Sequence, residues 1–477
     1  MSFASSITER YPMIARARLL VVRMVLLLLR LIAKAALSQS KATIIGIAGS
    51  IGKSSTRNAI ASVLAADGET ITVSGNSETG IPLGLVGLFP TDYSAIDWVR
   101  MLVSSLFRLR YLRNAKYIVV EMGIDDPYPP KNMEYLLSIL EPDIGIITYE
   151  SAAHTVQFEK LIGTRSFPTE EKKLSFLVDS ITYEDGKMLL TARCHFGIIN
   201  ADVEPLRNWR ETLPKSRLSS ISTYGSKTTD DCQYMDYAVS THGTTFSYHL
   251  ADTKEIVSLT FSRYALPREL AGIFAPVLLL CQKLGIPIAT AKTALAADFR
   301  PPKGRESIFE GTVGRTIIDS SYNASRPSVI AMLELLSILK TQTKRPTVAV
   351  LADMLELGNS AKLEHEKVAN ALTDEVDTLL CVGSLTKKYI LPYLDKQKKD
   401  KPATTEWFAT STALHQYLEE SLPENAIVLF KGSQGNLWLE ELIKPLLKNR
   451  SDVNRLCRQN AFWKKVKKKA GRWVDAH

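Results

Sequence analysis

The sequence predicts an α/β protein in which a P-loop domain built on a parallel sheet is followed by a second α/β domain. Its 477 residues exceed the size at which one hydrophobic core keeps growing, so two or more domains are expected. Residues 43–64 read as a strand, a glycine-rich loop and the start of a helix. Residues 347–433 alternate apolar strands (TVAVLAD, TLLCVGS, AIVLFKGS) with helical stretches, which is typical of a parallel sheet with crossover helices.

The composition is that of a folded protein from a reducing compartment. Hydrophobic residues make up 45% of the chain and charged residues 23%, which argues against disorder of the whole. The five cysteines are odd in number and form no C-x-x-C pair, so neither a disulfide framework nor a structural zinc site is expected. The net charge of +9 gathers near the two ends and suits phosphate-rich ligands, anionic membranes or nucleic acid.

The first expected element is a cationic amphipathic helix. Residues 19–37 are mostly Leu, Val, Ile and Met, but Arg23, Arg30 and Lys34 interrupt them, and no uncharged stretch between these charges approaches the roughly 20 residues that cross a bilayer. Three interpretations stay open: the helix packs on its own protein or on a partner subunit, it lies on an anionic membrane surface through residues 16–37, or it is a membrane span or uncleaved anchor. No A-x-A-type cleavage site follows convincingly, so secretion is not expected.

Residues 43–56 (TIIGIAGSIGKSST) predict a phosphate-binding loop. Glycines let backbone N–H groups turn toward phosphate oxygens, and the N-terminus of the following helix adds partial positive charge. Lys53 supplies a mobile cation, and the hydroxyl groups after it suit a Mg²⁺ ion. The predicted cofactor-binding residues of this loop are Gly49, Ser50, Gly52, Lys53, Ser54 and Ser55, and Ser54 is a predicted metal ligand.

The spacing G-x-x-G-x-x-G-K-S-S-T differs from the common Walker A pattern and resembles the loop of the Mur ligase family. One departure is Ala48, where the family usually has threonine. Further segments match in the same order over roughly residues 43–450, and within the family the similarity is greatest to the MurF type, which adds D-alanyl-D-alanine to a muramoyl tripeptide. The resemblance implies a central ATPase domain over residues 41–300, a Rossmann-like C-terminal domain over residues 301–450, and ATP with Mg²⁺ as cofactors.

Three segments of the central domain carry expected site residues. NSETGIPLGL resembles a family loop near the substrate, which implies Asn76 and Glu78 as substrate-binding residues. The strand YIVVE ends at Glu121, and a carboxylate at the carboxyl end of a strand beside a P-loop suits Mg²⁺. The resemblance gives Glu121 this role. YESAAH resembles N-I-x-P-A-H and implies that His154 is a catalytic metal ligand, with an ordinary structural histidine as the alternative.

A lysine downstream of this histidine is also expected to be catalytic. Family members carry a carbamylated or otherwise essential lysine there, but an insertion (TRSFPTEEKKLSF) shifts the spacing. Lys172 and Lys173 both remain candidates, and either could be an ordinary solvated lysine. Residues 195–265 alternate short apolar stretches with polar turns, which predicts a small, mostly antiparallel extension of the central domain.

The C-terminal domain supplies the remaining expected site residues. FRPPKGRESIFE carries the family's P-x-G-R element, which implies that Arg305 reaches the nucleotide phosphates. TIIDSSYNASRPS resembles D-D-x-Y-N-A-N-P, which implies that Asp319 contacts the ribose and that Tyr322 and Asn323 line the nucleotide. ADMLELG and KGSQ resemble two further family loops, with Gln434 in place of an arginine, and imply four substrate-binding residues, namely Asp353, Glu356, Lys431 and Ser433.

Two end segments complete the expected organisation: the N-terminal helix at residues 1–40 and a basic tail at residues 451–477 that contains Trp463 and Trp473. Such tails bind nucleic acid or membranes, but a solvated or self-docking tail is favoured here and no nucleic acid partner is expected. Classical family members begin with a separate domain that grips the UDP-sugar, and only the helix segment precedes the P-loop here. The muramoyl substrate is therefore an open point of the sequence interpretation.

The resemblance implies an ATP-dependent ligase that joins the carboxylate of a small-molecule or peptide substrate to an amine through an acyl phosphate. Three hypotheses follow. The first is a cytoplasmic peptidoglycan-type ligase held at the inner membrane face by its helix. The second is an amide ligase for another acidic substrate. The third is a nucleotide-binding scaffold subunit without ligase chemistry, suggested by departures from the family pattern at Ala48, Tyr149, Ala152, Arg268 and Glu269.

Overall fold

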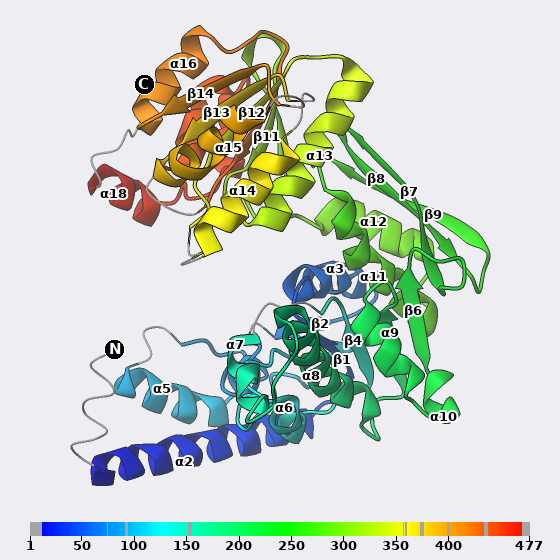
Figure 1. Ribbon diagram of the computed structural model, residues 1–477. Coiled ribbons are helices and arrows are strands. Elements are labelled where there is room, and N and C mark those ends of the chain that lie inside the picture. The colour runs from blue at the N-terminus through cyan, green and yellow to red at the C-terminus, as the bar shows by residue number, and fades with distance from the viewer. Residues whose placement is uncertain are drawn as a thin grey trace. The chain divides into compact units, whose positions relative to one another are not determined.

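The computed structural model describes residues 12–73, 75–90, 94–150, 155–355, 357, 360–372, 376–397, 401–433 and 437–469 (Figure 1). The chain divides into two compact units. Unit 1 comprises the residues up to 235 together with 247–257 and 271–299, and unit 2 comprises 236–246, 258–270 and the residues from 300 onward. The domain ranges expected from the sequence stay a prediction, because 236–246 and 258–270 lie inside the expected central domain and yet group with unit 2.

Among the described residues, unit 1 contains most of a nine-stranded sheet with the order β2-β3-β1-β4-β5-β6-β7-β8-β9. The first six strands pair in parallel and are β1 (Thr43–Ala48), β2 (Thr70–Val73), β3 (Tyr117–Glu121), β4 (Ile144–Ile147), β5 (Phe196–Asn200) and β6 (Ile221–Gly225). Strands β1, β3 and β4 are buried along almost their whole length, as expected for parallel strands that are covered on both faces.

The first part of the segment 195–265 differs from the antiparallel extension expected from the sequence. Strand β5 pairs in parallel with β4, β6 with β5, and β7 (Cys232–Ser240) with β6. Helices α9 (Glu204–Glu211) and α10 (Lys215–Leu218) lie between β5 and β6 in the chain and provide the crossover that parallel pairing requires. The sheet ends with β8 (Gly243–Leu250) and β9 (Glu255–Ser262), whose residues divide between the units.

Helices cover the parallel part of this sheet. Helix α3 (Lys53–Ala65) packs against α11 (Ala271–Leu284) and α12 (Ile288–Asp298), and α8 (Glu170–Leu190) packs against β4, α6 (Met133–Ile139) and α9 (Figure 1). The other described helices of unit 1 are α2 (Pro12–Leu37), α4 (Gly80–Gly84), α5 (Ala95–Leu106) and α7 (Thr155–Phe158).

The expected N-terminal helix is present as α2 and packs on its own protein along one face. Leu29, Ala33 and Ala36 are fully buried and join a core cluster that also contains Met101 and Leu112. In the part of the chain that the structure describes, no helix is long and apolar enough to span a membrane.

Unit 2 is a second α/β layer structure. Its described strands form a sheet with the order β10-β11-β15-β12-β13-β14, in which only β10–β11 is antiparallel. Their bounds are β10 (Ser307–Glu310), β11 (Thr316–Ser320), β12 (Thr347–Ala352), β13 (Thr378–Val382), β14 (Thr404–Phe408) and β15 (Ile427–Lys431). The predicted α/β fold with parallel sheets in two regions is thereby confirmed.

Two hydrophobic clusters sandwich the second sheet. Helices α13 (Arg326–Thr343) and α14 (Ala361–Ala371) contribute to one cluster, and α16 (Ser411–Glu420) and α17 (Leu439–Ile443) to the other. Helix α15 (Leu391–Lys396) follows a π-helical turn at Thr386–Ile390. Short 3₁₀ turns occupy Thr312–Gly314, Lys444–Leu446 and Arg450–Arg455, and the chain continues into α18 (Ala461–Lys469).

Candidate active site

The predicted phosphate loop joins β1 to α3 and depends on two glycines. Gly49 has φ of 120° and Gly52 has φ of 90°, a region that side chains with a Cβ rarely adopt. A Cβ on Gly49 would also lie 2.5 Å from the Thr148 hydroxyl oxygen. Because α3 begins at Lys53, the N–H groups of its first turn have no partner inside the helix and suit an anion.

The first part of the loop is tied to the segment after β4. The backbone N–H groups of Ser50 and Ile51 donate to the Tyr149 carbonyl at 2.7 and 3.2 Å, and Lys53 Nζ donates to the Gly49 carbonyl. Ser50 and Lys53 therefore lie at the loop as expected, but the backbone N–H of Ser50 bonds to protein. The cradle for phosphate oxygens consequently lies at Gly52 and the first turn of α3, where Ser54 and Ser55 also lie.

A carboxylate and a hydroxyl meet beside this helix end. The Ser54 hydroxyl donates to Glu121 Oε2 at 3.0 Å, since β3 is the parallel neighbour of β1 and both strands end at the same edge of the sheet. Hard oxygen donors of this kind fit Mg²⁺. Arg57, which the sequence interpretation missed, forms an ion pair with Glu121 at 2.8 Å because it lies one helical turn after Ser54.

The remaining metal prediction rests on His154, which lies outside the described residues. Among the residues that are described, no group of three or more His, Cys, Asp or Glu side chains could hold a metal ion. Ser54 and Glu121 are therefore the donors whose geometry the structure gives, and the role of His154 stays a prediction.

A buried pair of carboxyl groups under the loop was not foreseen. Asp185 Oδ2 accepts the Gly49 N–H at 2.9 Å, and Glu150 Oε2 accepts the Ser50 hydroxyl at 2.8 Å. Burial raises the pKa of both groups, and the neighbouring Glu150 charge raises the pKa of Asp185 further. The two groups therefore hold a proton at a pH where ordinary carboxyl groups are ionised. Lys53 acts in the opposite direction on both pKa values.

One signal for Asp185 was present in the sequence. It lies four residues after Ile181 and three before Met188, and all three side chains are on the buried face of α8. A charged residue at a core position of an apolar helical stripe indicates a buried polar site. The partner Glu150 could not be found in this way, because it lies in a loop.

The expected lysines begin this same helix. Lys172 is exposed, and Lys173 forms an ion pair with Glu159 at 2.9 Å that raises its pKa. Asp185, more than three turns further along α8, is the residue of this helix that contacts the phosphate loop. Asn76 is exposed, with its carbonyl accepting the Gly123 N–H at 2.9 Å, and Glu78 is half-buried.

We expect the buried pair to couple stability to pH. Because the pKa of Asp185 is raised, the folded protein holds a proton that the unfolded chain loses above about pH 4, so stability falls as pH rises from there. Asp185→Asn, whose amide oxygen can still accept from Gly49, should flatten the fall in Tm between about pH 5 and pH 8. Thermal unfolding measures this, with Asp298→Asn, at an exposed position of α12, as the control. An unchanged pH slope in Asp185→Asn would contradict the shared proton.

In unit 2, the predicted residues gather at the carboxyl ends of neighbouring strands. Asp319 lies in β11, Lys431 ends β15 and Asp353 follows β12. Burial raises the pKa of Asp319 to about 6 and lowers that of Lys431 to about 8. Lys431 Nζ donates to the Asn323 carbonyl at 2.6 Å. This edge is where ligands bind in open parallel sheets.

The side chains of this edge are not equally available. Asp319 Oδ1 accepts from the Ser321 hydroxyl at 2.6 Å, while its Oδ2 has no hydrogen-bond partner among the described residues. Asp353 instead accepts the backbone N–H groups of Leu385 and Thr386 at 3.0 and 2.9 Å, so it orders the turn after β13. Ser433 Oγ accepts the Leu355 N–H at 2.9 Å. Glu356 lies outside the described residues.

The ring of Tyr322 lies near two guanidinium groups. The Arg305 guanidinium carbon lies 5.3 Å from the ring centroid and that of Arg458 lies 5.1 Å from it. Arg305 is exposed, which suits the predicted contact with phosphate. Arg458 is buried and donates to the Tyr322 carbonyl at 2.7 Å. The sequence interpretation missed Arg458 because it lies in the expected basic tail.

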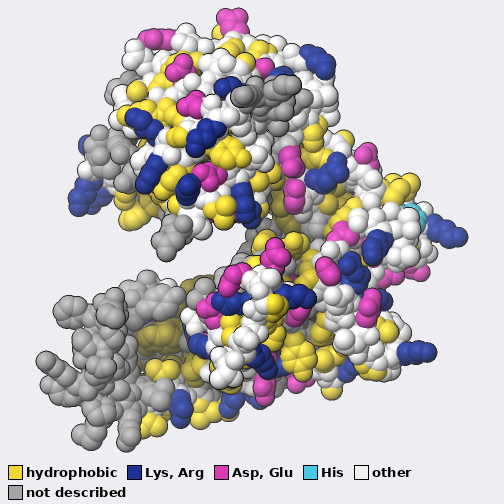
Figure 2. Space-filling model, viewed as in Figure 1, with side chains coloured by type: hydrophobic (Ala, Val, Ile, Leu, Met, Phe, Trp, Pro, Cys, Tyr) yellow, Lys and Arg dark blue, Asp and Glu magenta, His cyan; other side chains and the backbone are white. Residues whose placement is uncertain are grey.

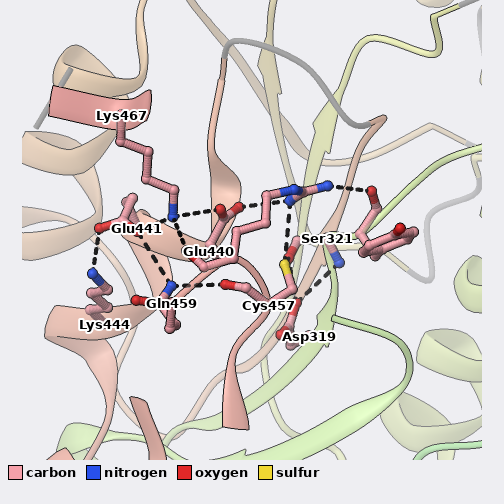
Figure 3. A network of polar contacts seen from close by, with 10 residues as sticks. Asp319, Ser321, Glu440, Glu441, Lys444, Cys457, Gln459 and Lys467 are labelled. Carbon is pink, nitrogen blue, oxygen red and sulfur yellow. Dashed lines mark hydrogen bonds and ion pairs between the residues drawn. The ribbon is translucent and has the colours of Figure 1, made fainter. Parts of the chain in front are cut away.

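The described part of that tail docks on unit 2 through buried charges (Figure 3). Lys467 Nζ lies 2.7 Å from Glu440 and also contacts Glu441, and Arg458 pairs with Glu440 at 3.1 Å. The Cys457 thiol lies 3.9 Å from the Ser321 hydroxyl oxygen. Residues 457–467 thus connect α17 to the loop after Asp319.

Comparisons with known proteins agree with this geometry. Residues 304–434 match the family described as "Mur ligase, glutamate ligase domain". The chain is 24% identical over 416 residues to the UDP-N-acetylmuramoyl-tripeptide–D-alanyl-D-alanine ligase of Buchnera aphidicola, covering 86% of this chain and 78% of the relative. It is also 24% identical to the ligase of that name from Escherichia coli K12, with the same coverage of both chains.

Solved structures show the same fold. The crystal structure of MurF from Acinetobacter baumannii superposes with a TM-score of 0.61 at 19% identity, covering 89% of this chain and 79% of that one. MurF ligase from Thermotoga maritima in complex with ADP superposes with a TM-score of 0.60 at 19% identity, covering 90% and 84%. The P-loop unit, the second α/β unit and these matches define a protein related to the Mur ligases. Within that family, the relatives named here are MurF ligases.

Proposed function

We propose that this chain is an ATP-dependent ligase that forms an amide bond between a substrate carboxylate and an amine in peptidoglycan precursor synthesis. The observation that carries the proposal is the meeting of Lys53, Ser54 and Glu121 at the start of α3, in a chain whose C-terminal part matches a Mur ligase domain. The relatives' names point to a muramoyl tripeptide as the acid and D-alanyl-D-alanine as the amine.

The chain's own residues have separable roles in this proposal. Lys53 and the first N–H groups of α3 bind the phosphates, and Ser54 with Glu121 holds Mg²⁺. Bound MgATP would supply the phosphoryl group that converts the substrate carboxylate into an acyl phosphate with release of ADP, and the amine would then displace inorganic phosphate to give the amide. Arg57 must release Glu121 in part when Mg²⁺ binds, since both cations use the same carboxylate. In unit 2, Asp319, Tyr322 and Asn323 are proposed to contact a nucleoside, and Arg305 offers a cation for phosphate.

A second candidate is a nucleotide-binding subunit without ligase chemistry. The ion pair of Glu121 with Arg57 and the bonds from Ser50 and Ile51 to the Tyr149 carbonyl favour it, because both engage groups that phosphate and magnesium would use. An amide ligase for another acidic substrate uses the same residues and differs only in the acid it accepts.

Phosphate release from ATP separates these candidates. We expect turnover that depends on a UDP-muramoyl-tripeptide and D-alanyl-D-alanine together. Turnover with a different acid and amine pair supports an amide ligase for another acidic substrate. ADP binding without stimulated turnover with any pair supports a nucleotide-binding subunit without ligase chemistry. Glu121→Gln provides the internal check, since it should lower turnover in either ligase.

We also propose that the protein is cytoplasmic and that α2 lies on the inner face of the plasma membrane. Leu20, Met24, Leu27, Leu28 and Leu31 are exposed on α2, and the opposite face belongs to the core of unit 1. Deleting the helix would uncover that core, so substitutions on the exposed face are the appropriate test.

A further inference from the structure

Helix α5 carries a row of apolar side chains that faces solvent. Ile96 is 83% exposed, Val99 62%, Val103 52% and Leu106 59%. Their spacing of three or four residues places them on one side of the helix, within about 100° of each other. Phe107, directly after the helix, extends the row and is 85% exposed. Surface helices of globular proteins normally turn such a row inward.

Helix α2 has an exposed apolar row of the same kind and packs against α5. Met24, Leu27, Leu28 and Leu31 fall within about 100° on α2 and are all exposed. The buried faces of the two helices share one core cluster, through Leu29 and Ala33 of α2 and Met101 of α5. Figure 1 shows the two helices side by side within unit 1, and both rows lie on the surface of this unit.

The charges that the two segments themselves carry are almost all positive. Residues 12–41 contain no Asp or Glu, and the only acid in residues 94–116 is Asp97, which is buried and paired with Arg100 at 2.6 Å. On α2, Arg23, Arg30 and Lys34 follow one edge of the apolar row. After α5, three exposed arginines follow Phe107, namely Arg108, Arg110 and Arg113. Figure 2 shows hydrophobic and basic side chains together along α2.

We infer that α2 and α5 with Phe107 form one membrane-binding surface for anionic lipid headgroups, in which α5 inserts beside α2. The inference rests on the proposed membrane role of α2 and adds a second helix to it. Apolar rows bordered by Lys and Arg match a bilayer interface, where side chains enter the acyl boundary and cations remain among the phosphates. A protein partner for so basic a surface would need a matching acidic apolar face, and a second copy of this chain offers the same positive charge.

Vesicle co-sedimentation of the full chain tests the inference. One triple variant changes α5 (Ile96→Gln, Val99→Gln, Val103→Gln), and a second changes α2 (Met24→Gln, Leu28→Gln, Leu31→Gln). A control triple changes exposed apolar residues on other elements (Leu174→Gln, Ile256→Gln, Leu363→Gln). Glutamine keeps helix propensity at least as high as valine or isoleucine. Circular dichroism and ADP affinity verify that each variant is folded.

We expect the wild type and the control triple to bind vesicles that contain phosphatidylglycerol. Both should bind pure phosphatidylcholine vesicles only weakly. The α5 triple should bind the anionic vesicles at least about tenfold more weakly. Unchanged binding of the α5 triple together with lost binding of the α2 triple would overturn the two-helix surface and leave the α2 proposal standing. If the wild type does not bind anionic vesicles, both the two-helix surface and the α2 proposal are wrong. A dimer that only the α5 triple dissociates would overturn the membrane role of α5. Ligase turnover is measured separately, and its presence or absence does not decide whether α2 or α5 binds membranes.

Discussion

Lys53→Ala should lower ATP-dependent phosphate release by about 10²- to 10³-fold, the cost typical of removing one electrostatic group at a transferring centre. The side chain lies over the loop, bonded to the Gly49 carbonyl and 3.5 Å from that of Ser50, and its charge lowers the pKa of the buried Glu150 and Asp185, which can keep their proton without it. Stability should therefore change by only about 1 kcal/mol. Turnover, calorimetric titration with MgADP and thermal unfolding together separate a phosphate-binding role from a structural one.

The matched control for this variant is Lys292→Ala, an exposed lysine on α12 of the same unit, which should leave turnover and nucleotide affinity unchanged. Lys53→Arg should retain part of the affinity, because the charge remains while its position shifts. If Lys53→Ala keeps full turnover, then the loop does not hold a triphosphate during catalysis, and the proposed ligase mechanism must be abandoned.

The loop could be anticipated from the sequence because its structure is local. Gly49, Gly52 and Lys53 lie within five residues of one another, and the strand before them and the helix after them fix their order. The position of Glu121 beside the loop could also be predicted from the sequence. The apolar run YIVVE indicates a parallel strand, and neighbouring parallel strands end at the same edge of a sheet. The two α/β sheets in the fold follow from the same reasoning about apolar runs and helical stretches.

Contacts between distant segments could not be anticipated in this way. Glu150 and Asp185 meet only because β4 and α8 pack together, and Arg57 reaches Glu121 only because α3 lies over β3. The sequence of the lysine-rich C-terminal segment indicates a solvated tail, because charged residues are so frequent in it. The pattern does not distinguish Lys467 from its neighbours Lys465 and Lys468. Burial beside Glu440 distinguishes that one lysine, and burial is a property of the tertiary fold.

Lys467→Met should lower the free energy of unfolding by about 3–5 kcal/mol, the usual cost of removing one partner from a buried ion pair. Lys467 is 2% exposed and lies against Glu440, which is fully buried, and Glu441, which is 4% exposed. Methionine matches the length of the apolar stem but leaves the Glu440 charge with Arg458 alone. Lys464→Met, on the exposed side of the same helix, should change stability by less than about 0.5 kcal/mol. Urea unfolding of both variants measures the difference.

A double variant tells whether the loss comes from the stranded charge or from the packing of α18. In Lys467→Met with Glu440→Gln, Glu441 keeps Lys444 at 2.6 Å and Arg458 keeps the Tyr322 carbonyl, so no carboxylate is left unpaired. We expect it to recover at least half of the lost stability, as coupled residues do in double-mutant cycles. Because Arg458 also holds the loop after Asp319, Lys467→Met should weaken ADP binding more than the double variant does. A double variant as unstable as Lys467→Met would show that α18 contributes through packing and that its buried charges do not hold the loop after Asp319.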